Sequence, residues 1–135
     1  MQIKKSADTD NFHYQGASYL ILSDLFRKLP DSLKNQNFID FGSGKGRALF
    51  CAEYTGFNNL IGVELDSDLV DISNENAKLY LKKRKESNFK FVCENALSFI
   101  IPENTSVFYF FNPFIQKLID FLPHHQLNIY SFIFY

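Results

Sequence analysis

Hydrophobic and polar positions along the chain follow a helical period first and then a mixture of extended and helical periods. An amphipathic helix is expected over Ser18–Leu29, where Leu22, Leu25, Phe26 and Leu29 fall at i, i+3, i+4 and i+7. Pro30 ends this segment, because proline cannot continue a helix.

After Pro30, short apolar runs alternate with helical patterns. Strands are predicted at Phe38–Phe41, Leu60–Leu65, Phe89–Cys93, Val107–Phe111 and Leu127–Tyr135, and helices at Ala48–Tyr54, from Ser67 onward, and over Ile115–Leu122. The apolar–charged alternation in the third run is typical of an edge strand, and the continuous aromatic fourth run is typical of a strand buried on both faces. Strands that alternate with helices imply right-handed crossovers and a parallel sheet. The pattern therefore predicts a Rossmann-like α/β fold of about five strands with helices on both faces.

The residues at both ends of the third predicted helix are of the types that stabilise helix termini. Ser67 is expected to be its N-cap, Asp68 and Asp71 lie in its first turn, and Lys82–Lys85 follow its last turn. These basic residues could contact nucleic acid, but such a cluster at a helix C-terminus is usually a solvated face, so nucleic acid is an unlikely partner.

Composition narrows the class of protein without naming a function. The chain has 135 residues, 46% of them hydrophobic, with 14 Lys+Arg and 15 Asp+Glu. This length suits a single domain over 1–135, and the net charge of −1 gives no general attraction to nucleic acid or to an anionic membrane. Apolar runs too short for a membrane span and an N-terminus without an apolar stretch lead us to expect a cytoplasmic protein. Cys51 and Cys93 are far apart, so we expect core cysteines and neither disulfides nor a metal site.

A glycine-rich segment follows the first predicted strand and opens a helix. It does not fit the phosphate-binding pattern GxxxxGK[ST], because Gly46 follows Lys45. It does not fit the dinucleotide pattern GxGxxG either, because Arg47 stands at the third glycine position. The pattern [DE]xGxGxG fits throughout, with Asp40, Gly42, Ser43, Gly44 and Gly46 in the loop.

This loop resembles motif I of the class I S-adenosylmethionine-dependent methyltransferases. The resemblance continues at Gly62-Val63-Glu64, Cys93-Glu94-Asn95-Ala96 and Asn112-Pro113-Phe114, each at the end of a predicted strand and in the order of the family. The loop, GVE and FFNPF are also similar to bacterial relatives of the non-SET histone-lysine methyltransferases. The resemblance covers the chain from about Ser18 to its end.

The resemblance implies S-adenosyl-L-methionine as the cofactor. The glycine loop and Asp40 would hold the cofactor, and Glu64 would accept hydrogen bonds from both ribose hydroxyls, with Asp66 as the rival for this role. Asn95 would accept from the adenine amino group, although an asparagine here also favours a turn. No metal is needed, because the cofactor carries its own activated methyl group.

The resemblance also suggests the acceptor side of the reaction. Asn112, Pro113 and Phe114 are similar to the [DN]PP[YF] motif of amine methyltransferases, without its second proline. They would be the catalytic residues, holding a neutral amine of a protein lysine or a small molecule. The missing proline leaves a nucleobase open as an acceptor.

The family's sheet order, 3-2-1-4-5-7-6, predicts order 3-2-1-4-5 here. No residues remain for strands 6 and 7, so a C-terminally truncated domain is expected, with Leu127–Tyr135 as an edge strand open to self-association. The alternative to an enzyme is a module that binds S-adenosylmethionine and transfers nothing. A nucleotide-dependent oxidoreductase is disfavoured by Arg47.

Overall fold

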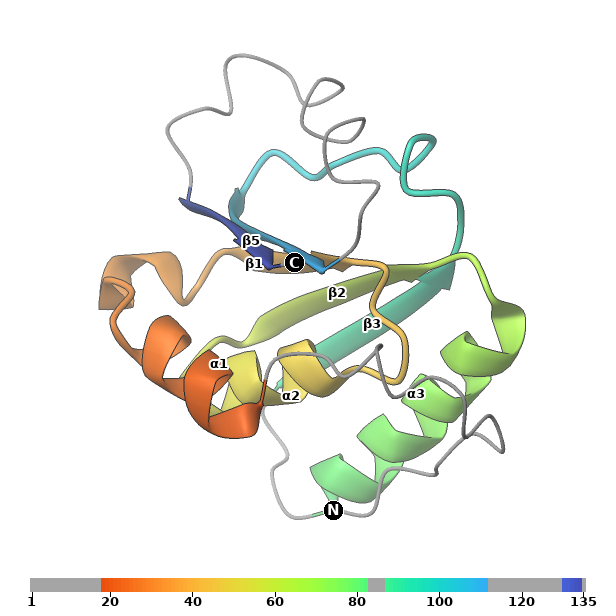
Figure 1. Cartoon of the computed structure of the whole chain (residues 1–135), viewed down its shortest axis with the longest axis horizontal. Coiled ribbons are helices and arrows are strands. Elements are labelled where there is room, and N and C mark those ends of the chain that lie inside the picture. Colours follow the sequence, from red (N-terminus) through yellow and green to blue (C-terminus); the bar gives the residue numbers. More distant parts are fainter. Residues whose placement is uncertain (1–17, 83–86, 112–129, 135) are drawn as a thin grey trace.

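The computed structural model describes residues 18–82, 87–111 and 130–134 (Figure 1), with side chains described as far as residue 110. Five strands form one sheet in the order β3-β2-β1-β4-β5, and each neighbouring pair is parallel. The strands are β1 (Asn37–Phe41), β2 (Asn59–Glu64), β3 (Asn88–Cys93), β4 (Thr105–Phe111) and β5 (Tyr130–Phe134). The predicted strand order is confirmed, and each predicted strand begins within three residues of its observed start.

The described helices are α1 (Tyr19–Arg27), α2 (Arg47–Tyr54) and α3 (Ser67–Leu81), with a short 3-10 turn at Asp31–Leu33. All three α-helices pack on the same face of the sheet, and in Figure 1 they lie together below it. The helix predicted over Ile115–Leu122 lies outside the described residues. Among the helices that the structure describes, none is long and apolar enough to cross a membrane.

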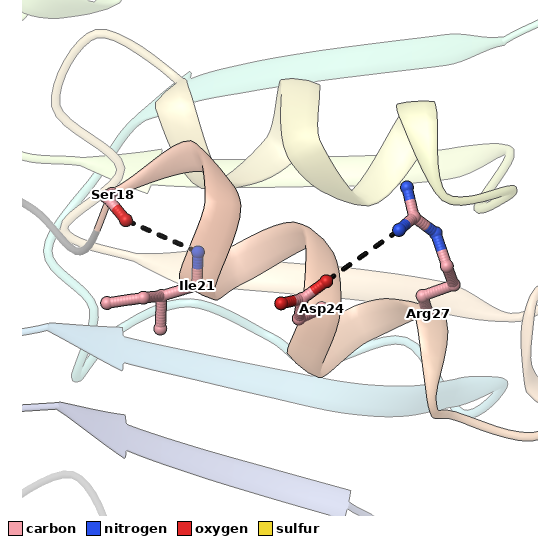
Figure 2. A network of polar contacts seen from close by, with 4 residues as sticks. All are labelled: Ser18, Ile21, Asp24 and Arg27. Atoms are coloured by element: carbon pink, nitrogen blue, oxygen red, sulfur yellow. Dashed lines mark hydrogen bonds and ion pairs between the residues drawn. The ribbon is translucent and has the colours of Figure 1, made fainter.

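The first turn of α1 is held by its capping residue. Ser18 has an extended backbone, and its hydroxyl oxygen accepts a hydrogen bond from the Ile21 N–H at 3.3 Å. One turn later, Asp24 and Arg27 form an exposed ion pair at 3.8 Å, which Figure 2 shows beside the cap. Such an exposed pair contributes little to stability, so the burial of Leu22 and Phe26 fixes α1 on the sheet.

The start of α3 differs from the expectation. Asp66, not Ser67, is the N-cap: its backbone is extended, and its carboxylate accepts hydrogen bonds from Asp68 N at 2.9 Å and Leu69 N at 3.4 Å. Ser67 is the first helical residue. A carboxylate can accept from two N–H groups of the first turn, which favours Asp66 at this position.

Two apolar layers cover the two faces of the sheet. The first layer lies between the sheet and the helices; its largest members are Phe26, Phe38, Phe50, Phe57, Phe91 and Tyr109. The second layer lies on the opposite face and is formed by Ile39, Phe41, Ile61, Val63, Phe108 and Phe110, with Phe99 and Ile101 packed on it. Strand β4 contributes to both layers, and β3 is at one edge of the sheet, as predicted. The interpretation of Cys93 as a core residue is wrong, because it is exposed at the end of this edge strand, whereas Cys51 is buried.

Candidate functional site

The candidate site lies where β1, β2 and β3 end. These strands are parallel neighbours, so their carboxyl ends meet at one edge of the sheet, which is where open α/β sheets bind ligands. The glycine loop, residues 42–46, leaves β1 at this edge and leads into α2 (Figure 1). Glu64 ends β2 at the same edge, and Asn95 follows β3 two residues after its end.

Backbone conformation explains the glycines of the loop. Gly42, Gly44 and Gly46 have φ angles of 77°, 55° and 92°, in the left-handed region that other residues rarely adopt. The loop is anchored on β2, because Gly42 N and Ser43 N both donate to the Val63 carbonyl, at 2.8 and 3.2 Å. A Cβ built on Gly44 would meet no heavy atom within 4 Å, so the space beside this residue is open to a ligand.

Glu64 connects the end of β2 to the glycine loop. Its Oε1 accepts a hydrogen bond from Gly44 N at 3.0 Å, and its Oε2 accepts one from Asp66 N at 2.9 Å. A carboxylate has about four acceptor positions, so both oxygens retain capacity for further donors such as hydroxyl groups. The Asp66 carboxylate, by contrast, is exposed and caps α3. The structure thus brings Glu64, and not its rival, against the loop.

Asp40 provides a buried acid beneath the loop. It lies in β1 beside Gly62 of β2, its side chain is 3% exposed, and its Oδ1 has no hydrogen-bond partner among the described residues. Burial, and then the nearby charge of Glu64, raise the pKa of Asp40 well above its ordinary value. The Ser43 hydroxyl oxygen is likewise buried and without a partner in the described part of the chain. Buried polar groups are normally hydrogen-bonded, so these two side chains are candidates for contact with a polar ligand.

Asn95 forms the turn after β3. Its Oδ1 accepts from Leu97 N at 2.9 Å, and its carbonyl accepts from Ser98 N at the same distance. The neighbouring Glu94 N donates to the Glu64 carbonyl at 3.0 Å, which keeps this turn beside the end of β2. The turn-forming interpretation is confirmed. The role of Asn95 toward adenine remains a prediction.

Two polar residues of α3 that the sequence analysis missed also contact the loop. Ser73 Oγ donates to the Gly44 carbonyl at 2.7 Å, and Asn76 Nδ2 lies 3.5 Å from the Lys45 carbonyl. Both side chains are at most 1% exposed. They share the buried face of α3 with Val70 and Ala77. Polar residues at helical spacing within an otherwise apolar face are the sequence feature that could have identified them.

Arg47 begins α2 directly after the loop. Its guanidinium lies 5.4 Å from the centre of the Tyr19 ring, in a cation–π arrangement that joins the starts of α1 and α2. Burial is the main cause that raises the pKa of Tyr19. The residue that excludes the dinucleotide pattern therefore packs against α1.

The predicted catalytic residues Asn112, Pro113 and Phe114 lie outside the described residues. The chain reaches them from Phe111, the last residue of β4. Strand β4 pairs with β1 in parallel, with Phe110 opposite Phe41, so β4 ends at the same edge of the sheet as the glycine loop.

Comparison with known proteins supports the fold. No family model matches the sequence, and no curated protein matches it. Among solved structures, a proposed S-adenosyl-L-methionine-dependent methyltransferase from Methanococcus maripaludis, MMP1179, is 12% identical, with a TM-score of 0.59 over 85% of this chain and 53% of that one. Geranyl diphosphate C-methyltransferase from Streptomyces coelicolor, solved with S-adenosyl-L-homocysteine, is 17% identical, with a TM-score of 0.55 over 70% and 34%. The [4+2]-cyclase SpnF is 18% identical, with a TM-score of 0.57 over 71% and 35%.

These similarities concern architecture. The chain spans about half the length of the first of these proteins and about a third of the other two. Two of them are named as methyltransferases and one as a cyclase, so the shared architecture by itself does not fix the reaction. The chain has the Rossmann-like α/β fold found in S-adenosylmethionine-dependent methyltransferases.

Proposed function

We propose that this chain binds S-adenosyl-L-methionine at the glycine loop and transfers its methyl group to an amine nitrogen. One observation carries the proposal: the loop and an acidic strand end are joined by the hydrogen bond from Gly44 N to Glu64 Oε1, at 3.0 Å. The loop pattern and a carboxylate at the end of the second strand are the two features of the family resemblance that concern the cofactor.

The residues at the loop fit this cofactor chemically. Glu64 retains acceptor capacity for two ribose hydroxyls after accepting from Gly44 N and Asp66 N. Asp40 offers a buried oxygen without a partner among the described residues, which suits a donor such as the cofactor's ammonium group. The open space beside Gly44 allows a ligand to approach the backbone closely.

The bound cofactor would supply a methyl group on a sulfonium, so the protein's task is binding and orientation. Holding donor and acceptor in line supplies most of the rate in such a reaction. We assign this acceptor role to Asn112, Pro113 and Phe114: the Asn112 side-chain oxygen and the Pro113 carbonyl would accept the amine's N–H groups, and the Phe114 ring would pack beside it. Their position after β4, which ends beside β1, supports this assignment.

The acceptor we favour is a primary amine, of a protein lysine or of a small molecule. The NPF sequence and the similarity to bacterial relatives of the non-SET histone-lysine methyltransferases support it. A nucleobase amine is the competing acceptor.

Calorimetry tests the first half of the proposal. Purified protein should bind S-adenosylmethionine and S-adenosylhomocysteine, and should not bind NAD or ATP. Failure to bind either cofactor form would refute the proposal, and preference for NAD would support an oxidoreductase.

The second candidate is a module that binds the cofactor without transferring its methyl group. It is favoured by the occurrence of the fold in the [4+2]-cyclase SpnF, which shows that the architecture is not tied to methyl transfer. Incubation with methyl-labelled S-adenosylmethionine and lysine-containing proteins, small amines or RNA separates the two. Label transfer to any of these supports an enzyme, and binding without transfer supports the module.

A further inference from the structure

Gly44 is held from two sides by side chains of different elements. Its N–H donates to Glu64 Oε1 from the end of β2, and its carbonyl accepts from Ser73 Oγ of α3 at 2.7 Å. The next carbonyl, of Lys45, lies 3.5 Å from Asn76 Nδ2, also of α3. Ser73 and Asn76 are three residues apart, so they lie on the same face of the helix.

These two residues are unusual members of a packed helix face. Ser73 is 0% exposed and Asn76 1%, and their neighbours on this face are Val70 and Ala77. Burying a hydroxyl or an amide is unfavourable unless it is hydrogen-bonded, and an apolar residue would pack here without that cost. The contact with the loop carbonyls offsets the burial, which indicates that the polar groups are present for the loop.

The hydrogen bond from Ser73 fixes more than one atom of the loop. A trans peptide is planar, and its carbonyl and N–H point in opposite directions. Because the Gly44 carbonyl points at α3, the N–H of Lys45 points away from α3. Glycine has a wider range of backbone conformations than other residues, so a partner for the Gly44 carbonyl restricts the orientation of this peptide plane.

We propose that Ser73, assisted by Asn76, is a positioning residue that holds the glycine loop in its ligand-binding conformation. This inference rests on the proposed function for the identity of the ligand. Ser73 acts on the ligand through the Gly44–Lys45 peptide, so its removal weakens binding even though the fold persists.

Ser106 provides a matched control elsewhere in the molecule. It is also buried, at 1% exposed, and its Oγ donates to a backbone carbonyl, that of Leu33, at 3.1 Å. It is the second residue of β4, at the end of the strand opposite to the site. Ser73→Ala and Ser106→Ala therefore remove the same kind of hydrogen bond, and only the first removes it from the loop.

The experiment measures the affinity for S-adenosylhomocysteine and the free energy of unfolding of both variants. We expect Ser73→Ala to bind about three- to tenfold more weakly than the wild type. Ser106→Ala should bind within about twofold of the wild type at a similar loss of stability, because distant sites act independently. Equal affinities of the two variants would overturn the inference.

Amide hydrogen exchange, followed by NMR without ligand, gives a second readout. Ser73→Ala should speed the exchange of Gly44 and Gly46 relative to Ser106→Ala, because the loop is released; unchanged exchange at both amides would contradict the inference. Absence of binding by the wild type would refute the proposed function alone, since the exchange measurement still decides whether α3 holds the loop.

Discussion

Replacement of Glu64 by alanine is the sharpest test of the site. The change removes the acceptor of two backbone N–H groups, from Gly44 at 3.0 Å and Asp66 at 2.9 Å. Both N–H groups are reachable by water in part, because Glu64 is only half-buried, so we expect a loss of stability of about 1 to 2 kcal/mol. The fold should persist, since the apolar layers on both faces of the sheet are untouched.

The effect on cofactor binding should exceed the effect on stability. Two ribose hydroxyls would lose a charged acceptor, and hydrogen bonds to charged groups contribute about 1.5 to 3 kcal/mol. We apply this range to the two hydroxyl hydrogen bonds together and do not double it, because water replaces part of the lost interaction in a half-buried site. It corresponds to roughly 10- to 150-fold weaker binding of S-adenosylmethionine, measured by calorimetry.

Asp66→Ala is the matched control. It removes a carboxylate two residues away and costs the N-cap of α3, about 0.5 to 2 kcal/mol of stability. It leaves the Asp66 N–H to donate to Glu64, so cofactor affinity should change little. If Asp66→Ala weakens binding more than Glu64→Ala does, then Asp66 is the ribose ligand and the assignment of Glu64 is wrong.

Four further outcomes are expected. Gly62→Ala should lower the free energy of unfolding by about 1 to 3 kcal/mol in urea denaturation, because its Cβ would lie 2.7 Å from atoms of two neighbouring side chains; a neutral effect would contradict this. Asn112→Ala should lower the rate of methyl transfer at saturating cofactor with little change in cofactor affinity, and the reverse pattern would refute its acceptor role. Asp40→Asn should remove a pH dependence of the free energy of unfolding. Burial raises the folded-state pKa of Asp40 above its ordinary value of 3.8, so the wild type should lose stability as the pH rises from about 4 toward that folded-state pKa. An identical pH profile of wild type and variant would contradict this. Finally, β5 lies beyond β4 at one end of the described sheet, and its segment carries no charge, proline or glycine over residues 127–135, so we expect self-association in analytical ultracentrifugation at high micromolar concentration; a stable monomer there would refute it.

Much of the fold could be predicted because the strands are short apolar runs bounded by polar residues and glycines. The aromatic run of β4 indicated burial on both faces, and Phe108 and Tyr109 indeed belong to opposite apolar layers. The strand order came from the family resemblance, since periodicity alone does not select neighbours. Element boundaries were less certain: Asp66 and Ser67 are both good N-cap residues, and only the backbone conformation at Asp66 decides between them.

The site could be predicted only in its local part. The glycine spacing is a property of five consecutive residues, so the sequence reveals it directly. The hydrogen bond between Ser73 and Gly44 joins residues 29 positions apart. The helical period predicts which face of the helix carries Ser73, but not which distant residue Ser73 contacts. The position of Glu64 near the loop could be predicted, because the ends of neighbouring parallel strands meet at one edge of the sheet. The two backbone N–H groups that donate to Glu64 could not be predicted from the sequence.

Gly62 contributes to the site although the family motif at this strand end concerns Glu64. In the sequence, Gly62-Val63-Glu64 indicates a ligand-binding carboxylate at Glu64, whereas in the structure Gly62 has a role of its own. A Cβ on Gly62 would lie 2.7 Å from Ser43 Oγ and from a ring carbon of Phe91. The glycine loop therefore crosses directly over β2 at Gly62, and this close approach lets Gly44 reach the carboxylate of Glu64 two residues further along the strand. Loop and strand end form one site because Gly62 has no side chain that would hold the loop away from β2.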